Sequence, residues 1–228
     1  KISLIEQPDG VQSQTSENAV TSDSGITVYP SEGGRLIAAR EENGGYVTVD
    51  EFQAFDGAEA YSLAFDSEGN LFAVSGADAV DPENSPAGSV CMIKKEYFDG
   101  EAAAADSIYR MTFSDGEACE NDMLCTEEGM AVLTNSACYM LKAGKSGIET
   151  VFETAYETGF SGGESYGSGS GLTQTEEFLL FTDNAEELSL VVLDKKTGET
   201  VLTQPLFGVK ENTAVEYPVI AYGQEDSV

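Results

Sequence analysis

A short unit of sequence recurs three times along this chain, and no other feature constrains the fold as strongly. Each copy places a small polar turn between two apolar, strand-like runs. The turns lie at residues 74–78 (VSGAD), 133–137 (LTNSA) and 181–185 (FTDNA). A unit that recurs at intervals of roughly 45–60 residues predicts one supersecondary element that is stacked or arrayed.

The runs beside these turns are short and apolar, with clusters of glycine, asparagine and aspartate between them, as in antiparallel strands. Three or four strands in each copy match a propeller blade. We therefore predict an all-β fold, a β-propeller of four-stranded antiparallel blades. Residues 1–24 are expected to form an extended N-terminal arm, and residues 25–228 a propeller domain of about four blades.

The third copy carries a family resemblance. It contains GSGSGL at 167–172, FTDNA at 181–185 and LDKKTGE at 193–199, followed by ENTAVEYPVIAYG at 211–223. These segments resemble the repeats and inter-blade links of secreted bacterial β-propellers in the broad quinoprotein-like and PQQ-repeat-like group. The resemblance implies a secreted, periplasmic or cell-surface location. The chain has no tryptophan, which marks many quinone-binding repeats, so no quinone is predicted.

A further strand pattern begins as the sequence ends. We therefore expect a truncated last blade and an incomplete ring as one alternative. Further sequence or another chain would then complete the ring.

Charge and composition exclude several classes of function. The chain has 41 acidic and 11 basic residues, a formal net charge of −30, which disfavours nucleic acids and anionic lipid surfaces. No apolar stretch approaches the roughly 18–20 residues of a membrane span, so no membrane insertion is expected. Histidine is absent, which excludes imidazole bases and histidine-ligated metals within these residues.

The four cysteines leave two readings open. An even number permits disulfides in an exported protein, and a loop-closing bridge between Cys119 and Cys125 is consistent with their spacing. Cys91 and Cys138 lie in apolar runs, where buried thiols and a disulfide are alternatives.

Acidic turns supply candidate ligands for calcium, which prefers hard oxygen ligands. The predicted metal-binding residues are Asp66, Glu68 and Asn70. A second set with the same chemistry is Asp183, Asn184 and Glu186. A solvated β-turn is the alternative for both sets, because Asp, Asn and Gly also favour turns.

A glycine-rich run at 159–171, which includes Gly169, could border a ligand entrance. Asp183 and Asn184 lie in the third repeated turn. Glu216 lies in an apolar context, which predicts partial burial and a raised pKa. These four residues, Gly169, Asp183, Asn184 and Glu216, are the predicted binding residues.

These observations predict an extracytoplasmic binding or scaffold protein without a catalytic centre in this chain. A protein or carbohydrate surface is the expected partner, and calcium is the one cofactor left open. The alternative is a propeller enzyme, either a quinone-cofactor oxidoreductase or a carboxylate-based polysaccharide hydrolase or lyase.

Overall fold

The computed structural model describes residues 19–76, 87–119, 121–159, 166–168, 170–206, 215 and 217–221. These residues form four antiparallel sheets of four strands each, and each sheet is a simple meander in chain order. We call these sheets blades 1 to 4. The prediction of an all-β fold of four-stranded antiparallel blades is confirmed.

The strand bounds follow the chain. Blade 1 contains β1 (Val20–Thr21), β2 (Ile26–Ser31), β3 (Arg35–Glu42) and β4 (Gly45–Gln53). Blade 2 contains β5 (Ala60–Phe65), β6 (Leu71–Ser75), β7 (Ser89–Ile93) and β8 (Ile108–Thr112). Blade 3 contains β9 (Leu124–Cys125), β10 (Met130–Leu133), β11 (Ala137–Ala143) and β12 (Ile148–Ala155). Blade 4 contains β13 (Thr173–Gln174), β14 (Phe178–Thr182), β15 (Ser189–Asp194) and β16 (Thr200–Pro205).

Two short helices, α1 (Lys95–Phe98) and α2 (Ala104–Ser107), connect β7 to β8. No described helix is long and apolar enough to cross a bilayer. Strand β1 lies inside the segment predicted as an extended arm. Its Val20 packs against the apolar cluster between blades 1 and 2, and the remainder of that arm, residues 1–18, lies outside the described residues.

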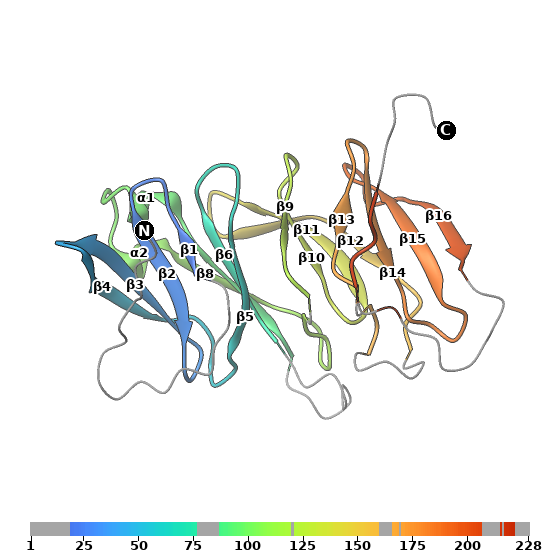
Figure 1. The fold of residues 1–228 in the computed structure, drawn as a ribbon, viewed down its shortest axis with the longest axis horizontal. Coiled ribbons are helices and arrows are strands. Elements are labelled where there is room, and N and C mark those ends of the chain that lie inside the picture. Colours follow the sequence, from blue (N-terminus) through green and yellow to red (C-terminus); the bar gives the residue numbers. More distant parts are fainter. Residues whose placement is uncertain are drawn as a thin grey trace.

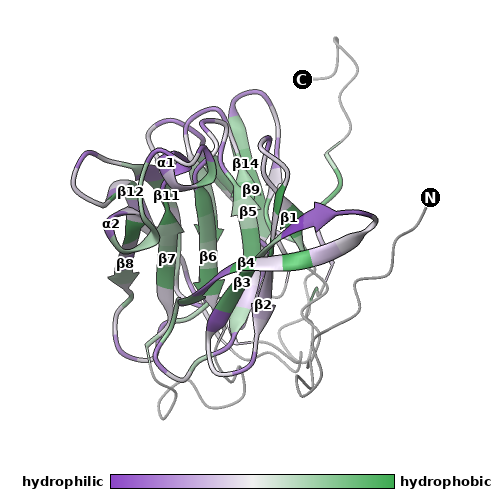
Figure 2. Ribbon diagram, turned by 90° about the vertical axis from the view of Figure 1, so that its left-hand side faces the viewer, coloured by the Kyte–Doolittle hydropathy of each residue, from purple (hydrophilic) through white to green (hydrophobic). Residues whose placement is uncertain are grey.

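The blades stand side by side in chain order, and blades 1 and 4 lie at opposite ends of the row (Figure 1). One apolar cluster fills each junction, between blades 1 and 2, 2 and 3, and 3 and 4. The buried parts of the middle strands are mainly apolar, as the hydropathy colouring shows for β6 and β7 of blade 2 (Figure 2). The core is therefore three layers between sheets.

Strand alternation explains these layers. Successive side chains of a strand point to opposite faces, so Leu71 and Ala73 of β6 face blade 1, while Phe72 and Val74 face blade 3. Both faces are buried, which requires a continuous apolar run and not an alternating one.

The meander also decides which loops meet. In each blade the turn between the second and third strands lies at the same end as the connection to the next blade. We call this the inter-blade end. It holds the β2–β3, β6–β7, β10–β11 and β14–β15 turns, and it is the lower end in Figure 1.

Candidate functional site

The repeated sequence unit lies where the second strand of blades 2, 3 and 4 ends, at the inter-blade end; Ala77 and Asp78 of the first copy lie outside the described residues. In each copy a small polar side chain accepts backbone hydrogen bonds across the turn. Ser75 Oγ accepts from the Ser89 amide at 2.8 Å, and Thr134 Oγ1 accepts from the Ala137 amide at 2.9 Å. Asp183 Oδ1 accepts from the Ser189 amide at 2.9 Å. The turn chemistry therefore recurs in all three blades, although the acceptor is the second residue of the first two copies and the third residue of FTDNA.

A buried carboxylate lies behind the turn of blade 3. Glu117 is 5% exposed, and its Oε1 accepts hydrogen bonds from Thr134 Oγ1 at 2.6 Å and from the Tyr139 hydroxyl at 2.9 Å. Burial, then the bond to Glu117, then the neighbouring Glu153 carboxylate raise the pKa of Tyr139. The tyrosine therefore stays a donor, and it holds the carboxylate in place.

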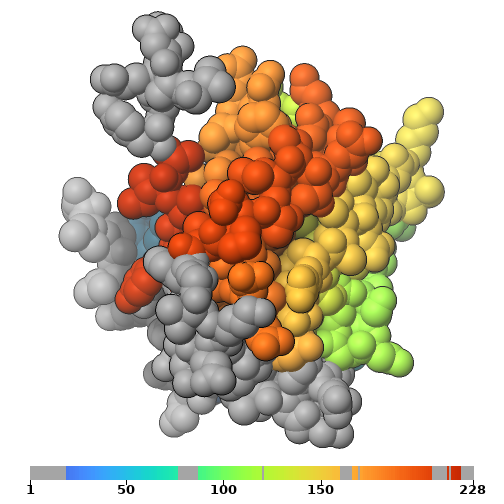
Figure 3. Space-filling model, turned by 90° about the vertical axis from the view of Figure 1, so that its right-hand side faces the viewer, coloured from blue at the N-terminus to red at the C-terminus, as the bar shows by residue number. Residues whose placement is uncertain are grey.

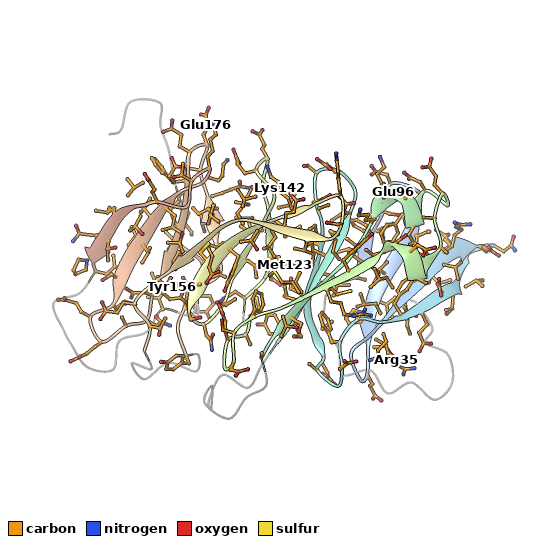
Figure 4. The ribbon with its side chains drawn as sticks, turned by 180° about the vertical axis from the view of Figure 1, so that it is seen from behind. Arg35, Glu96, Met123, Lys142, Tyr156 and Glu176 are labelled. Carbon is orange, nitrogen blue, oxygen red and sulfur yellow. The ribbon has the colours of Figure 1, made fainter. Side chains whose placement is uncertain are left out.

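The same end joins blade 3 to blade 4. The Tyr156 hydroxyl donates to the Thr134 carbonyl at 2.6 Å and accepts from the Ser168 amide at 2.9 Å. Asn121 Nδ2 donates to the Ser168 carbonyl at 2.6 Å. In the side-chain view Tyr156 lies at this end, whereas Glu96, Lys142 and Glu176 lie at the opposite end (Figure 4).

Two of the predicted binding residues, Asp183 and Asn184, lie in the β14–β15 turn at the same end. Asn184 exchanges hydrogen bonds with the backbone of Val215, at 3.0 Å through Oδ1 and 3.4 Å through Nδ2. Burial is the main cause of the raised pKa of Asp183, against backbone hydrogen bonds that lower it. Gly169 and Glu216 lie outside the described residues. Binding by all four stays a prediction.

The predicted calcium ligands Asp66, Glu68 and Asn70 lie in the β5–β6 turn, at the end opposite the inter-blade end. Asp66 Oδ1 accepts from the amides of Glu68 at 2.9 Å and Asn70 at 2.8 Å, and Oδ2 accepts from Asn70 Nδ2 at 2.8 Å. Asn70 Oδ1 in turn accepts from the Lys95 amide. In the described part of the chain, no three acidic or cysteine side chains are grouped to hold a metal ion. Calcium binding at either predicted set stays a prediction.

All four cysteines are free thiols in the structure, which departs from the disulfide alternative. Cys119 Sγ lies 3.0 Å from the Asn121 carbonyl oxygen and 3.3 Å from that of Leu133. Cys91 and Cys138 lie in different apolar clusters, because they sit on opposite faces of their blades. Burial raises the pKa of Cys91 to about 11 and of Cys138 to about 12.

Two sets of buried charged side chains could not be predicted from the sequence. Glu117 is one of 41 acidic residues, and nothing in its local sequence marks it as buried. Lys195 Nζ lies 3.6 Å from Glu128 Oε2 in a largely buried ion pair between blades 4 and 3. Lys195 lies between Asp194 and Lys196 in a polar turn, so its local sequence predicts neither its burial nor its partner.

Comparisons with known proteins define a fold class. No family model matches the chain, and no curated protein matches it. Among solved structures, the extracellular domain of BT4673 from B. thetaiotaomicron is similar with a TM-score of 0.53 at 11% identity, over 87% of this chain and 24% of that one.

Two further solved structures show the same likeness. A functionally unknown protein from Desulfotomaculum acetoxidans DSM 771 has a TM-score of 0.52 at 12% identity, covering 85% of this chain and 56% of that one. A europium-containing methanol dehydrogenase has a TM-score of 0.52 at 10% identity, covering 79% and 40%. This chain thus spans between a quarter and just over half of these proteins. At such identities the likeness concerns the propeller-like fold alone.

Proposed function

We propose that this chain is an extracytoplasmic binding or scaffold module whose ligand surface is the inter-blade end. The observation that carries the proposal is the buried hydrogen-bond network at that end, which ties Glu117, Thr134, Tyr156 and Ser168 across the connections between blades. Fully satisfied networks of this kind fix turn geometry, so the surface above them is held in one arrangement before a ligand arrives.

The extracytoplasmic location rests on the likeness to an extracellular domain. It also agrees with the resemblance of the third repeat to secreted propellers. Repeat folds commonly present such shared ends as binding surfaces.

Charge restricts the ligand. A chain with a formal net charge of −30 repels anionic polymers at long range and attracts cationic ones, while neutral polymers approach without an electrostatic penalty. The described turns of the inter-blade end carry hydroxyl, amide and carboxylate groups, among them Thr134, Asn135 and Asp183. Such groups hydrogen-bond to sugar hydroxyls and to peptide surfaces alike.

Calorimetric titration with arabinoxylan (neutral), chitosan hexamer (cationic) and polygalacturonate (anionic) tests this proposal. Ser136 lies at the β10–β11 turn of the inter-blade end, and Ser146 lies at the β11–β12 turn of the opposite end. We expect binding of the neutral or cationic glycan, weakened at least about tenfold by Ser136→Lys and unchanged by Ser146→Lys. Equal effects of both variants, or binding of polygalacturonate alone, contradict the proposed surface.

An absorbance spectrum of the purified protein separates this proposal from an oxidoreductase. A stoichiometric quinone chromophore contradicts a binding module without a catalytic centre, whereas tyrosine absorption alone argues against redox chemistry.

A further inference from the structure

A pocket lies between blades 1 and 2, at the end of the row opposite the inter-blade end. Three segments that are distant in the sequence form it: the β1–β2 turn, the β5–β6 turn and helix α1 with the residue after it. They meet at the upper end in Figure 1, far from blade 4, whose outer side faces the viewer in Figure 3. The pocket has a volume of about 190 Å³. Pockets for drug-sized ligands have roughly 300–1,000 Å³, so this pocket admits a smaller molecule.

The inner wall of the pocket is aromatic. Phe65 of β5 and Phe98 of α1 line it, with their ring centroids 5.1 Å apart in an edge-to-face arrangement. Phe98 is buried and belongs to the apolar cluster between blades 1 and 2. The Ser24 hydroxyl donates to the Phe98 carbonyl at 2.7 Å, which holds α1 against the β1–β2 turn. Such a wall packs against the carbon atoms of an organic ligand and also attracts cations.

The rim of the pocket is acidic. Asp23, Asp66, Glu68 and Asp99 bring four carboxyl groups to it, and Lys95 brings the one basic group among its lining residues. Lys95 Nζ lies 3.8 Å from Asp99 Oδ2, so these two charges offset each other. In the described part of the chain, neither Asp23 nor Glu68 forms an ion pair. An excess of negative charge therefore surrounds the aromatic wall.

The arrangement of these carboxyl groups fits an organic cation better than a bare metal ion. Calcium takes roughly 6–8 oxygen ligands within about 2.6 Å, so several oxygens must converge on one point. Among the residues that the structure describes, no three acidic side chains converge in this way. Both carboxyl oxygens of Asp66 already accept hydrogen bonds within the β5–β6 turn. An ammonium group needs no such convergence, because it pairs with carboxylates singly.

We propose that this pocket binds a small alkylammonium ion. The ammonium group lies among the rim carboxylates, and the alkyl chain packs against Phe65 and Phe98. The charge of the rim selects a cation, and the aromatic wall selects an organic one, so two independent features specify the same class of ligand. The pocket lies at the end opposite the proposed ligand surface, so this inference goes beyond the proposed function and does not depend on it.

Titration of the full chain with n-pentylamine, followed in amide NMR spectra at neutral pH, tests this site. The matched probes are 1-pentanol, which is neutral, and pentanoate, which is anionic, because both keep the five-carbon chain. We expect pentylamine to shift the amide signals of residues 22–24, 66–69 and 95–99. We also expect it to bind at least about fivefold more tightly than 1-pentanol, and pentanoate to bind more weakly than either.

A pair of charge-reversal variants locates the ammonium group. Glu68→Lys is expected to weaken pentylamine binding at least about tenfold, because it replaces a rim carboxylate with a cation. Glu96→Lys is the matched control, since it makes the same change of charge at the same end of the row (Figure 4) but Glu96 does not line the pocket. The side chains of Lys95, Phe98 and Asp99 share the pocket face of α1, because residues three and four apart lie on one side of a helix.

Weaker binding in Glu68→Lys and in Asp23→Lys, but not in Glu96→Lys, supports the site, and the amide spectra report whether each variant is folded. Equal affinities for pentylamine and 1-pentanol overturn the proposal, and so does equal weakening in all three variants. The absence of shifts at millimolar pentylamine also overturns it, as do shifts confined to other residues. Displacement of pentylamine by equimolar calcium chloride would assign the pocket to a metal ion and overturn it as well.

Discussion

Removal of one hydroxyl group tests whether the buried network at the inter-blade end contributes to stability. Tyr139→Phe deletes the donor that lies 2.9 Å from Glu117 Oε1 and leaves the aromatic packing in place. Hydrogen bonds to charged groups contribute roughly 1.5–3 kcal/mol, and both partners are buried. We therefore expect the free energy of unfolding to fall by about 1.5–3 kcal/mol.

The same loss is visible as a thermal shift. For a domain of this length each kcal/mol corresponds to roughly 2–4 °C, so the melting temperature is expected to fall by about 3–12 °C. Urea unfolding followed by circular dichroism measures the free energy directly. Tyr109→Phe is the control: Tyr109 is half-buried and its ring contacts Lys94 Nζ, 4.9 Å from the centroid, so its hydroxyl is not part of the network.

A double-mutant cycle with Glu117→Gln decides whether the two residues act together. We expect the double variant to lose about 1–2 kcal/mol less than the sum of the single variants. Strict additivity refutes the interaction, and so does a Tyr139→Phe protein that matches the wild type within about 0.5 kcal/mol.

Three further changes have expected outcomes. Lys195→Met leaves the Glu128 carboxylate largely buried without its cation, so we expect the free energy of unfolding to fall by about 2–3 kcal/mol. The double variant with Glu128→Gln is expected to recover most of this loss, and urea unfolding measures both. Burial raises the pKa of Cys138 from 9.0 to about 12, so its contribution to stability is complete below pH 9 and is lost as the pH rises toward 12. The unfolding free energy should therefore fall by up to about 1.4 kcal/mol per pH unit in this range, and less steeply in Cys138→Ala; parallel slopes contradict this. Gly167 has a φ of +78°, and an added Cβ would collide with a backbone carbonyl of the β10–β11 turn. Gly25 has a similar φ of +83°, but no atom lies within 4 Å of its added Cβ. Gly167→Ala is therefore expected to lower the melting temperature more than Gly25→Ala.

The blades could be predicted because their determinants are local. Apolar runs of strand length, glycine and aspartate turns, and the recurrence of VSGAD, LTNSA and FTDNA are all visible in the sequence. For the same reason the β-turn role of Asp183 could be predicted from the sequence, because its hydrogen-bond partner Ser189 is only six residues away.

The chemistry between the blades could not be predicted in the same way. Glu117 and Tyr139 are 22 residues apart, and Lys195 and Glu128 belong to different blades. No pattern in the chain singles out these acids from the other acidic residues, because their burial depends on which loops meet at one end of the row. The four thiols are a similar case, since spacing alone allowed pairings that the positions of the blades do not form.

The sequence by itself determined an array of antiparallel blades, because strand alternation and turn chemistry act over a few residues and repeat with the blade. Only the tertiary structure decided which polar side chains are buried together and which distant turns meet. Those outcomes depend on contacts between residues that are distant in the chain and become neighbours only when the sheets stack.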